Sequence, residues 1–102
     1  MARRSCDASE VLVQLDGVFD VRAAREVQKV IEGVRAGGAV RVDLSRVREF
    51  HDFGIAVLAQ AVKHGGAVRV ALQGLRHHQA RMLRYFGVDA ARLGWRVSVE
   101  NV

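Results

Sequence analysis

The chain has 102 residues, half of them hydrophobic, and a formal charge of +5. This length leaves room for one compact domain, which we expect to span residues 1–102, and it excludes a second domain of ordinary size. No apolar run reaches the roughly 20 residues that cross a bilayer, and the N-terminus lacks the apolar segment of a signal peptide. Cys6 is the only cysteine, which excludes an internal disulfide and a cysteine-based zinc cluster. We therefore expect a cytoplasmic protein without direct membrane insertion.

The positive charge is spread along the whole chain instead of forming a block. The few aromatic residues have no spacing suited to stacking bases, and no helix-turn-helix pattern is visible. A generally basic, soluble surface explains the charge without a polyanionic ligand. The sequence thus predicts no binding of nucleic acid.

The N-terminal fifth of the chain predicts extended structure. Residues 1–8 are expected to form a flexible tail, and a strand follows at Glu10–Leu15. The pair Asp16-Gly17 is typical of a turn, and Val18-Phe19 predicts a brief second extended piece.

Three segments carry apolar residues at helical spacing, which predicts helices at about Val21–Ala36, Gly54–His64 and Arg76–Phe86. Asp20 and Asp52 precede the first two segments and are expected to serve as N-caps, because a carboxylate there accepts hydrogen bonds from unpaired N–H groups. In and just before the third segment, the residues expected to face inward are Leu75, Met82, Leu83 and Phe86.

Alternating strands lie between these helices. The hexapeptide Gly-Gly-Ala-Val-Arg-Val occurs at Gly37–Val42 and again at Gly65–Val70, each time ending a helical pattern and starting a strand. The apolar positions of the predicted strands are Val40, Val42, Leu44, Val68, Val70, Leu72, Trp95, Val97 and Val99. The positions between them are mostly polar, so only one face of the sheet is expected to be buried, with Arg41, Asp43, Arg69 and Arg96 nearer solvent.

These elements predict an α/β fold in the order β-(β)-α-β-α-β-α-β, with the helices mainly on one face of the sheet. The element order and the residues Gly17, Val42–Ser45, Phe50, Gly54, Leu58 and Phe86-Gly87 resemble the STAS domain family, that of anti-sigma factor antagonists. The resemblance extends over about Glu10–Val88. It implies a single-sided sheet and a module that binds a protein partner, often an ATP-dependent kinase that restrains a sigma factor.

The segment before Gly54 departs from the family pattern. In the family this loop normally ends Asp-Ser-Ser-Gly, and phosphorylation of the serine before the glycine releases the partner. Aligned on Gly54, Phe53 matches the family phosphoserine, and Asp52 and His51 take the two positions before it. With no hydroxyl in these four residues, we predict that the protein is not switched by serine phosphorylation at this site.

The resemblance implies that the partner is bound by the loop Ser45–Phe53 and the helix start, with Ser45, His51, Asp52, Phe53 and Gly54 as the partner-binding residues. Asp43, at the end of the preceding strand, is expected to support the loop. For Phe53 two interpretations stay open: an outward apolar anchor for the partner, or an inward side chain that fills the core. Asp52 likewise fits either an N-cap or a permanent negative charge that imitates a phosphate.

Three classes of function follow. The first is an anti-sigma factor antagonist-like module that binds an anti-sigma factor kinase or a signalling scaffold. The second, which the resemblance also permits, is an accessory subunit of a lipid-transport ABC system. The third is a sensor of small molecules or nucleotides, with its site on the polar sheet face or at the helix start. The sequence leaves the oligomeric state open.

Catalysis and metal binding are not expected. The chain has no phosphate-binding loop and no nucleophile elbow, and Asp43, His51 and Asp52 form only a weak catalytic set. The histidines His51, His64, His77 and His78 have no spacing that forces them together around a metal. We predict a binding protein without a cofactor.

Overall fold

The computed structural model describes residues 2–6, 10–65, 68–88 and 95–99, and it describes side-chain burial for 10–65 and 68–88. Five strands form one sheet in the spatial order β1-β2-β3-β4-β5. The strands are β1 (Ala2–Cys6), β2 (Glu10–Phe19), β3 (Ala39–Phe50), β4 (Arg69–Leu75) and β5 (Trp95–Val99). The helices are α1 (Val21–Gly33), α2 (Asp52–Lys63) and α3 (His77–Tyr85).

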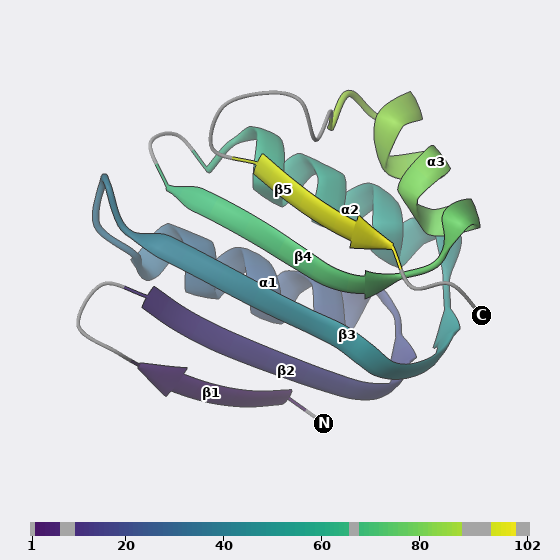
Figure 1. Ribbon diagram of the computed structural model, residues 1–102, viewed down its shortest axis with the longest axis horizontal. Helices are drawn as coiled ribbons and strands as arrows, with labels where there is room; N and C mark the ends of the chain where they lie inside the picture. The colour runs from purple at the N-terminus through teal and green to yellow at the C-terminus, as the bar shows by residue number, and fades with distance from the viewer. Residues whose placement is uncertain (1, 7–9, 66–67, 89–94, 100–102) are drawn as a thin grey trace.

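The helices lie on one face of the sheet. Figure 1 shows α1 and α2 side by side behind the strands, with α3 next to α2 at one end. Strands β2 to β5 are parallel, and each connection between them contains a helix. This arrangement confirms the predicted single-sided α/β layer. No helix in the described ranges is long and apolar enough to cross a membrane.

The expected flexible tail was wrong for most of its length. Residues 2–6 form β1, which pairs antiparallel with β2 from Ala2 opposite Leu15 to Cys6 opposite Val11. An edge strand needs only backbone hydrogen bonds to one neighbour. The polar sequence of this segment therefore carries no apolar alternation from which the strand could be predicted.

Strands β2 and β3 are longer than predicted. The expected turn at Asp16-Gly17 lies inside β2, which continues to Phe19, and the expected loop after Leu44 is strand as far as Phe50. The register between the two strands shifts after Gln14 and again after Gly17. Each shift is an irregularity that interrupts the alternation of side chains, so the sequence pattern ends before the strand does.

The core lies between the sheet and the helices. Its sheet side consists of the predicted apolar positions of β3 and β4 together with residues of β2, and its helix side comes mainly from α1 and α2. Its largest buried side chains include Phe19, Leu44, Ile55, Leu58, Leu72, Leu75 and Leu83. The exposed positions Arg41 and Arg69 confirm the predicted polar face. The side chains of Trp95, Val97 and Val99, predicted to point inward, and that of Arg96 lie outside the described residues.

The helices differ from prediction at their ends. Helix α1 ends at Gly33 instead of Ala36, because Val34 is already extended. Helix α2 begins at Asp52, before the predicted Gly54. On α3, Leu83 is buried and Met82 packs against the core, but Phe86 is 36% exposed, so its predicted inward position was wrong. Phe86 follows the last helical residue, where the helical period no longer fixes its direction.

Candidate functional site at the start of α2

The helices α1, α2 and α3 begin where the parallel strands β2, β3 and β4 end. We call this side of the sheet the carboxyl edge. The backbone N–H of His51 donates to the carbonyl oxygen of Phe19 at 2.9 Å, which joins the start of α2 to the end of β2. Because parallel strands bring their carboxyl ends together, residues distant in sequence meet here.

Aromatic side chains connect this edge to the core. The rings of Phe19 and Phe50 are tilted at 47° with centroids 6.1 Å apart. The guanidinium carbon of Arg76 lies 5.8 Å from the centre of the Phe50 ring, within the range of a cation–π contact. Phe19 is fully buried and Phe50 partly so. Phe50 therefore links the buried ring of Phe19 to Arg76 at the edge.

Gly54 is buried where α2 crosses the start of α1. A Cβ at this position would lie 2.9 Å from the carbonyl carbon and oxygen of Asp20 and 3.0 Å from the carbonyl oxygen of Phe19. Glycine is thus required for close approach of two backbones. This contact places the first turn of α2 against the connection between β2 and α1.

Phe53 points outward. Its side chain is 79% exposed, on the second residue of α2. Val18, the penultimate residue of β2, is also exposed, at 44%. Of the two interpretations of Phe53, the structure therefore favours the outward one, and it places two exposed apolar side chains at the carboxyl edge.

The predicted N-cap role of Asp52 was wrong. His51 is the N-cap of α2, without a side-chain hydrogen bond, and Asp52 is the first helical residue. A carboxylate in the first turn still interacts favourably with the helix dipole. Asp52 Oδ1 lies 3.9 Å from His78 Nε2, and His51 Nε2 lies 3.7 Å from Glu49 Oε2, so two exposed histidine–carboxylate pairs lie beside Phe53.

Asp43 binds Ser45, farther back along β3. Its Oδ1 accepts hydrogen bonds from the Ser45 hydroxyl at 2.6 Å and the Ser45 N–H at 3.0 Å, and its Oδ2 accepts one from Gln14 Nε2 at 3.4 Å. Partial burial raises the pKa of the Asp43 carboxyl, but these hydrogen bonds outweigh burial and leave the pKa below its ordinary value.

A second close approach of backbones holds Ser45 in place. Gly74 of β4 has a φ of +84°, and a Cβ there would overlap the backbone of Ser45. At about 3.3 Å per residue, β3 covers roughly 20 Å between Ser45 and His51. Of the predicted partner-binding residues, His51, Asp52, Phe53 and Gly54 are thus together, whereas Ser45 lies apart from them.

Asp43, His51 and Asp52, the weak catalytic set of the sequence analysis, do not bond to one another. Asp43 bonds Ser45 and Gln14, whereas His51 and Asp52 pair with Glu49 and His78. Within the ranges that the structure describes, no three His, Cys, Asp or Glu side chains come together as a metal site.

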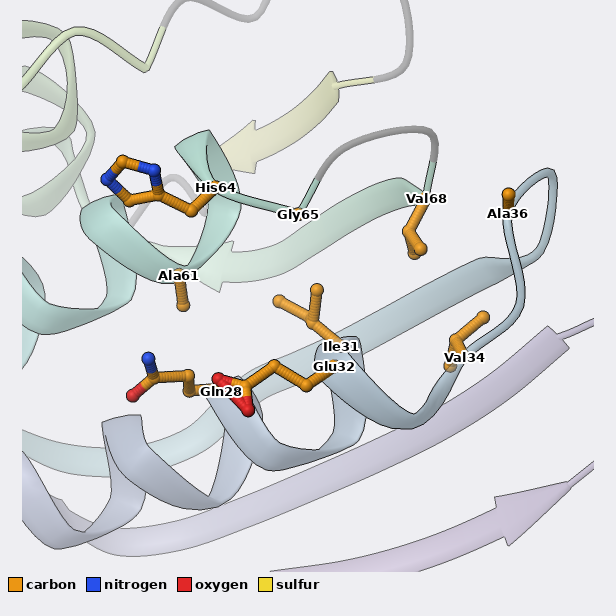
Figure 2. Close-up of a pocket in the computed structure, with 9 residues that line it drawn as sticks. All are labelled: Gln28, Ile31, Glu32, Val34, Ala36, Ala61, His64, Gly65 and Val68. Carbon is orange, nitrogen blue, oxygen red and sulfur yellow. The ribbon is translucent and has the colours of Figure 1, made fainter.

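A pocket of about 280 Å³ lies at the opposite end of α1 and α2. Figure 2 shows it between the two helix ends, with Gln28 and Glu32 on one side and Ala61 and His64 on the other. Ile31, Ala61 and Val68 are almost completely buried, so the pocket exposes little apolar surface. It lies neither on the polar sheet face nor at the start of α2, where a sensor site was expected.

A family model described as "Mlab, STAS domain" matches residues 2–97. The chain belongs to the STAS domain family. No sequence among functionally curated proteins is significantly similar to this chain.

Solved structures show the same fold. A variant of RsbS from Moorella thermoacetica, with a serine replaced by glutamate, superposes with a TM-score of 0.69 at 17% identity, covering 98% of this STAS domain and 87% of that chain. The anti-sigma factor antagonist SpoIIAA in its unphosphorylated form has a TM-score of 0.63 at 13% identity, with coverage of 100% and 90%. A chain of the stressosome, described as a signal integration and transduction hub, has a TM-score of 0.58 at 18% identity, with coverage of 96% and 88%.

Sequence reasoning missed the roles of three residues at the edge of this STAS domain. Phe50 and Arg76 form the cation–π contact, and Val18 adds exposed apolar surface. Val18 directly follows the Asp16-Gly17 pair, and this pair was the one local signal in the sequence. Arg76 had no signal, because its contact with Phe50 joins the end of β4 to the end of β3.

Proposed function

We propose that this STAS domain is a protein-binding regulatory module, similar in role to an anti-sigma factor antagonist, and that Phe53 is the centre of its docking surface. The observation that carries the proposal is the 79% exposure of a phenyl ring on a fixed helix start. Exposed aromatic side chains that become desolvated in a complex often dominate its binding energy.

The surroundings of Phe53 support this role. Gly54 fixes the first turn of α2 against Asp20, so the ring is presented by rigid backbone. His51 and Asp52 supply polar groups at the rim, whereas Ser45, held by Asp43 farther back along β3, lies outside this surface. A preorganised surface loses little conformational entropy on binding. The domain would act by occupancy in the cytoplasm, without chemistry of its own.

The partner that we propose is an anti-sigma factor kinase or a signalling scaffold. Structures of an anti-sigma factor antagonist and of a stressosome chain share this fold, which supports a signalling role. Because Phe53 occupies the position that the resemblance assigns to the phosphoserine, binding would not be released by phosphorylation at that position.

A second partner class is favoured by the same side chain. A subunit that stays attached to the ATPase of a lipid-transport ABC system needs no phosphorylation switch, and a phenyl ring cannot be phosphorylated. In this case Phe53 would anchor the domain on the transporter ATPase. The two classes share one docking surface and differ in the protein that occupies it.

The test is affinity purification of the tagged protein from its own cells, followed by mass spectrometry. Phe53→Ala should lose the specific partner, and Phe53→Leu, which keeps an apolar side chain, should retain part of it. Lys29→Ala, an exposed substitution on α1, serves as the control. Circular dichroism verifies that each variant is folded.

The identity of the partner decides between the classes. Recovery of a kinase or signalling complex supports the sigma-factor role, and recovery of a transporter ATPase supports lipid transport. Equal recovery of the same partners by wild type and Phe53→Ala would refute the docking surface. A thermal-shift screen with nucleotides tests the sensor alternative, because a specific ligand stabilises the folded state by mass action.

A further inference from the structure

Helix α3 presents a cationic outer surface. The segment from Arg76 to Val88 contains three arginines and two histidines but no aspartate or glutamate. Arg81, Arg84 and Tyr85 are all exposed, and Tyr85 is the most exposed large hydrophobic side chain in the described part of the molecule, at 85%. We call these three residues the α3 surface.

The α3 surface is held in a fixed orientation. Leu83 and Gln79 are buried on the inner side of the helix. The backbone N–H of Val88 donates to the carbonyl oxygen of Leu83 at 2.9 Å, which closes the C-terminal end of the helix. Residues 81, 84 and 85 are spaced i, i+3 and i+4, so their side chains share one helix face.

The same three residues line an open concavity of about 450 Å³. Across the described ranges, neither Arg81 nor Arg84 forms an ion pair. Lys63 of α2 lies against Gly87, 3.2 Å from where a Cβ would be, and adds a cation near the end of the helix. The guanidinium group has a planar fork of donors that matches a carboxylate, and tyrosine combines an apolar ring with a hydroxyl.

We propose that the α3 surface binds an acidic segment of a protein partner, through carboxylates on Arg81 and Arg84 and packing against Tyr85. The charge of the helix is complementary to such a segment. An anionic membrane fits less well, because a helix that lies on a membrane needs a wide apolar face. Here Leu83 is directed into the core, and the exposed large apolar side chains of the described segment from Arg76 to Val88 are Tyr85 and, at 36%, Phe86, which do not make a wide apolar face.

The probe is a fluorescein-labelled hexaglutamate peptide, with hexaglutamine as the uncharged reference, followed by fluorescence anisotropy at low ionic strength. The test variant is Arg81→Gln/Arg84→Gln. The control is Arg22→Gln/Arg25→Gln, which removes two exposed arginines from α1 and changes the net charge equally. The peptide has no apolar residue, so the result does not depend on docking at Phe53.

The α3 variant should bind hexaglutamate about tenfold more weakly than wild type, the sum of two exposed ion pairs. The α1 control should bind like wild type, and both variants should keep the wild-type circular dichroism spectrum. Equal weakening in the two variants would mean a general charge effect and would overturn the proposal. Absence of hexaglutamate binding by the wild-type protein would overturn it too. So would a wild-type protein that binds phosphatidylglycerol vesicles but not hexaglutamate.

Discussion

The starts of α1 and α2 lie against each other at the carboxyl edge, yet they are completed differently. At α1, Asp20 Oδ1 accepts a hydrogen bond from the N–H of Ala23 at 3.0 Å. This bond pairs one of the backbone N–H groups that the first turn of a helix leaves free. At α2, His51 makes no such side-chain bond, and the second helical residue, Phe53, points to solvent. The start of α1 thus has a side-chain cap, whereas the start of α2 has none and exposes an aromatic ring.

The phenylalanines around these helix starts show the same contrast. Phe19, just before α1, is fully buried and stacks against Phe50, whereas Phe53 has no place in the core. At this edge, an aromatic side chain is buried when it points between the sheet and the helices, and exposed when it points away from them. This difference also separates residues that stabilise the fold from residues available for binding.

The largest expected effect tests this separation directly. Phe19→Ala should lower the free energy of unfolding by about 3 to 5 kcal/mol, because it removes a ring from a closely packed core. Phe53→Ala should change it by less than about 0.5 kcal/mol, since the ring is mostly in water. Urea denaturation followed by circular dichroism measures both values. A loss of several kcal/mol for Phe53→Ala would mean that this ring belongs to the core.

The contact between the two helix starts gives the next largest effect. Gly54→Ala should destabilise the protein by about 1 to 3 kcal/mol, because the added methyl meets the backbone of Asp20 and Phe19. The matched control is Gly33→Ala at the end of α1, where a Cβ meets nothing within 4 Å. Thermal denaturation should show a lower midpoint for the first and an unchanged or higher midpoint for the second. Equal midpoints would contradict the close approach.

The caps can be compared by removing one carboxylate at a time. The hydrogen bond from the N–H of Ala23 is the main cause of the lowered pKa of Asp20. Asp20→Ala should therefore lower the melting temperature more than Asp52→Ala, which removes only an interaction with the helix dipole. Differential scanning calorimetry at pH 7 provides the comparison. The reverse order would show that the start of α2 depends on Asp52 as its cap.

The smallest expected effect concerns pH. The folded-state pKa of Asp43 is below its ordinary value of 3.8, so its contribution to stability is present above that value and is lost as the pH falls through the folded pKa. We expect Asp43→Asn to remove this loss, an effect below about 1 kcal/mol because the carboxyl is only partly buried and solvent screens it. Urea midpoints between pH 2 and pH 6 test it, and parallel curves for wild type and variant would contradict it.

The residues of the site were predictable to different degrees. Resemblance to the family pointed to the segment before Gly54, and His51, Asp52 and Phe53 do lie together at the helix start. The direction of Phe53 could not be predicted, because the second residue of a helix can face either the core or solvent. Ser45 was expected in a loop with them but is a strand residue held by Asp43 and Gly74.

The sequence by itself determined the α/β class, the single-sided sheet, the buried positions of β3 and β4, and the cap at Asp20. These features depend on local periodicity or on bonds within a few residues. Only the tertiary structure decided that residues 2–6 form a strand, that β3 continues to Phe50, that Gly54 must lack a side chain, and that Phe53 is exposed. The first three depend on contact with another element, β2 for β1 and for β3 and the start of α1 for Gly54, and the direction of Phe53 depends on how α2 packs. Local residue patterns carry no record of these contacts.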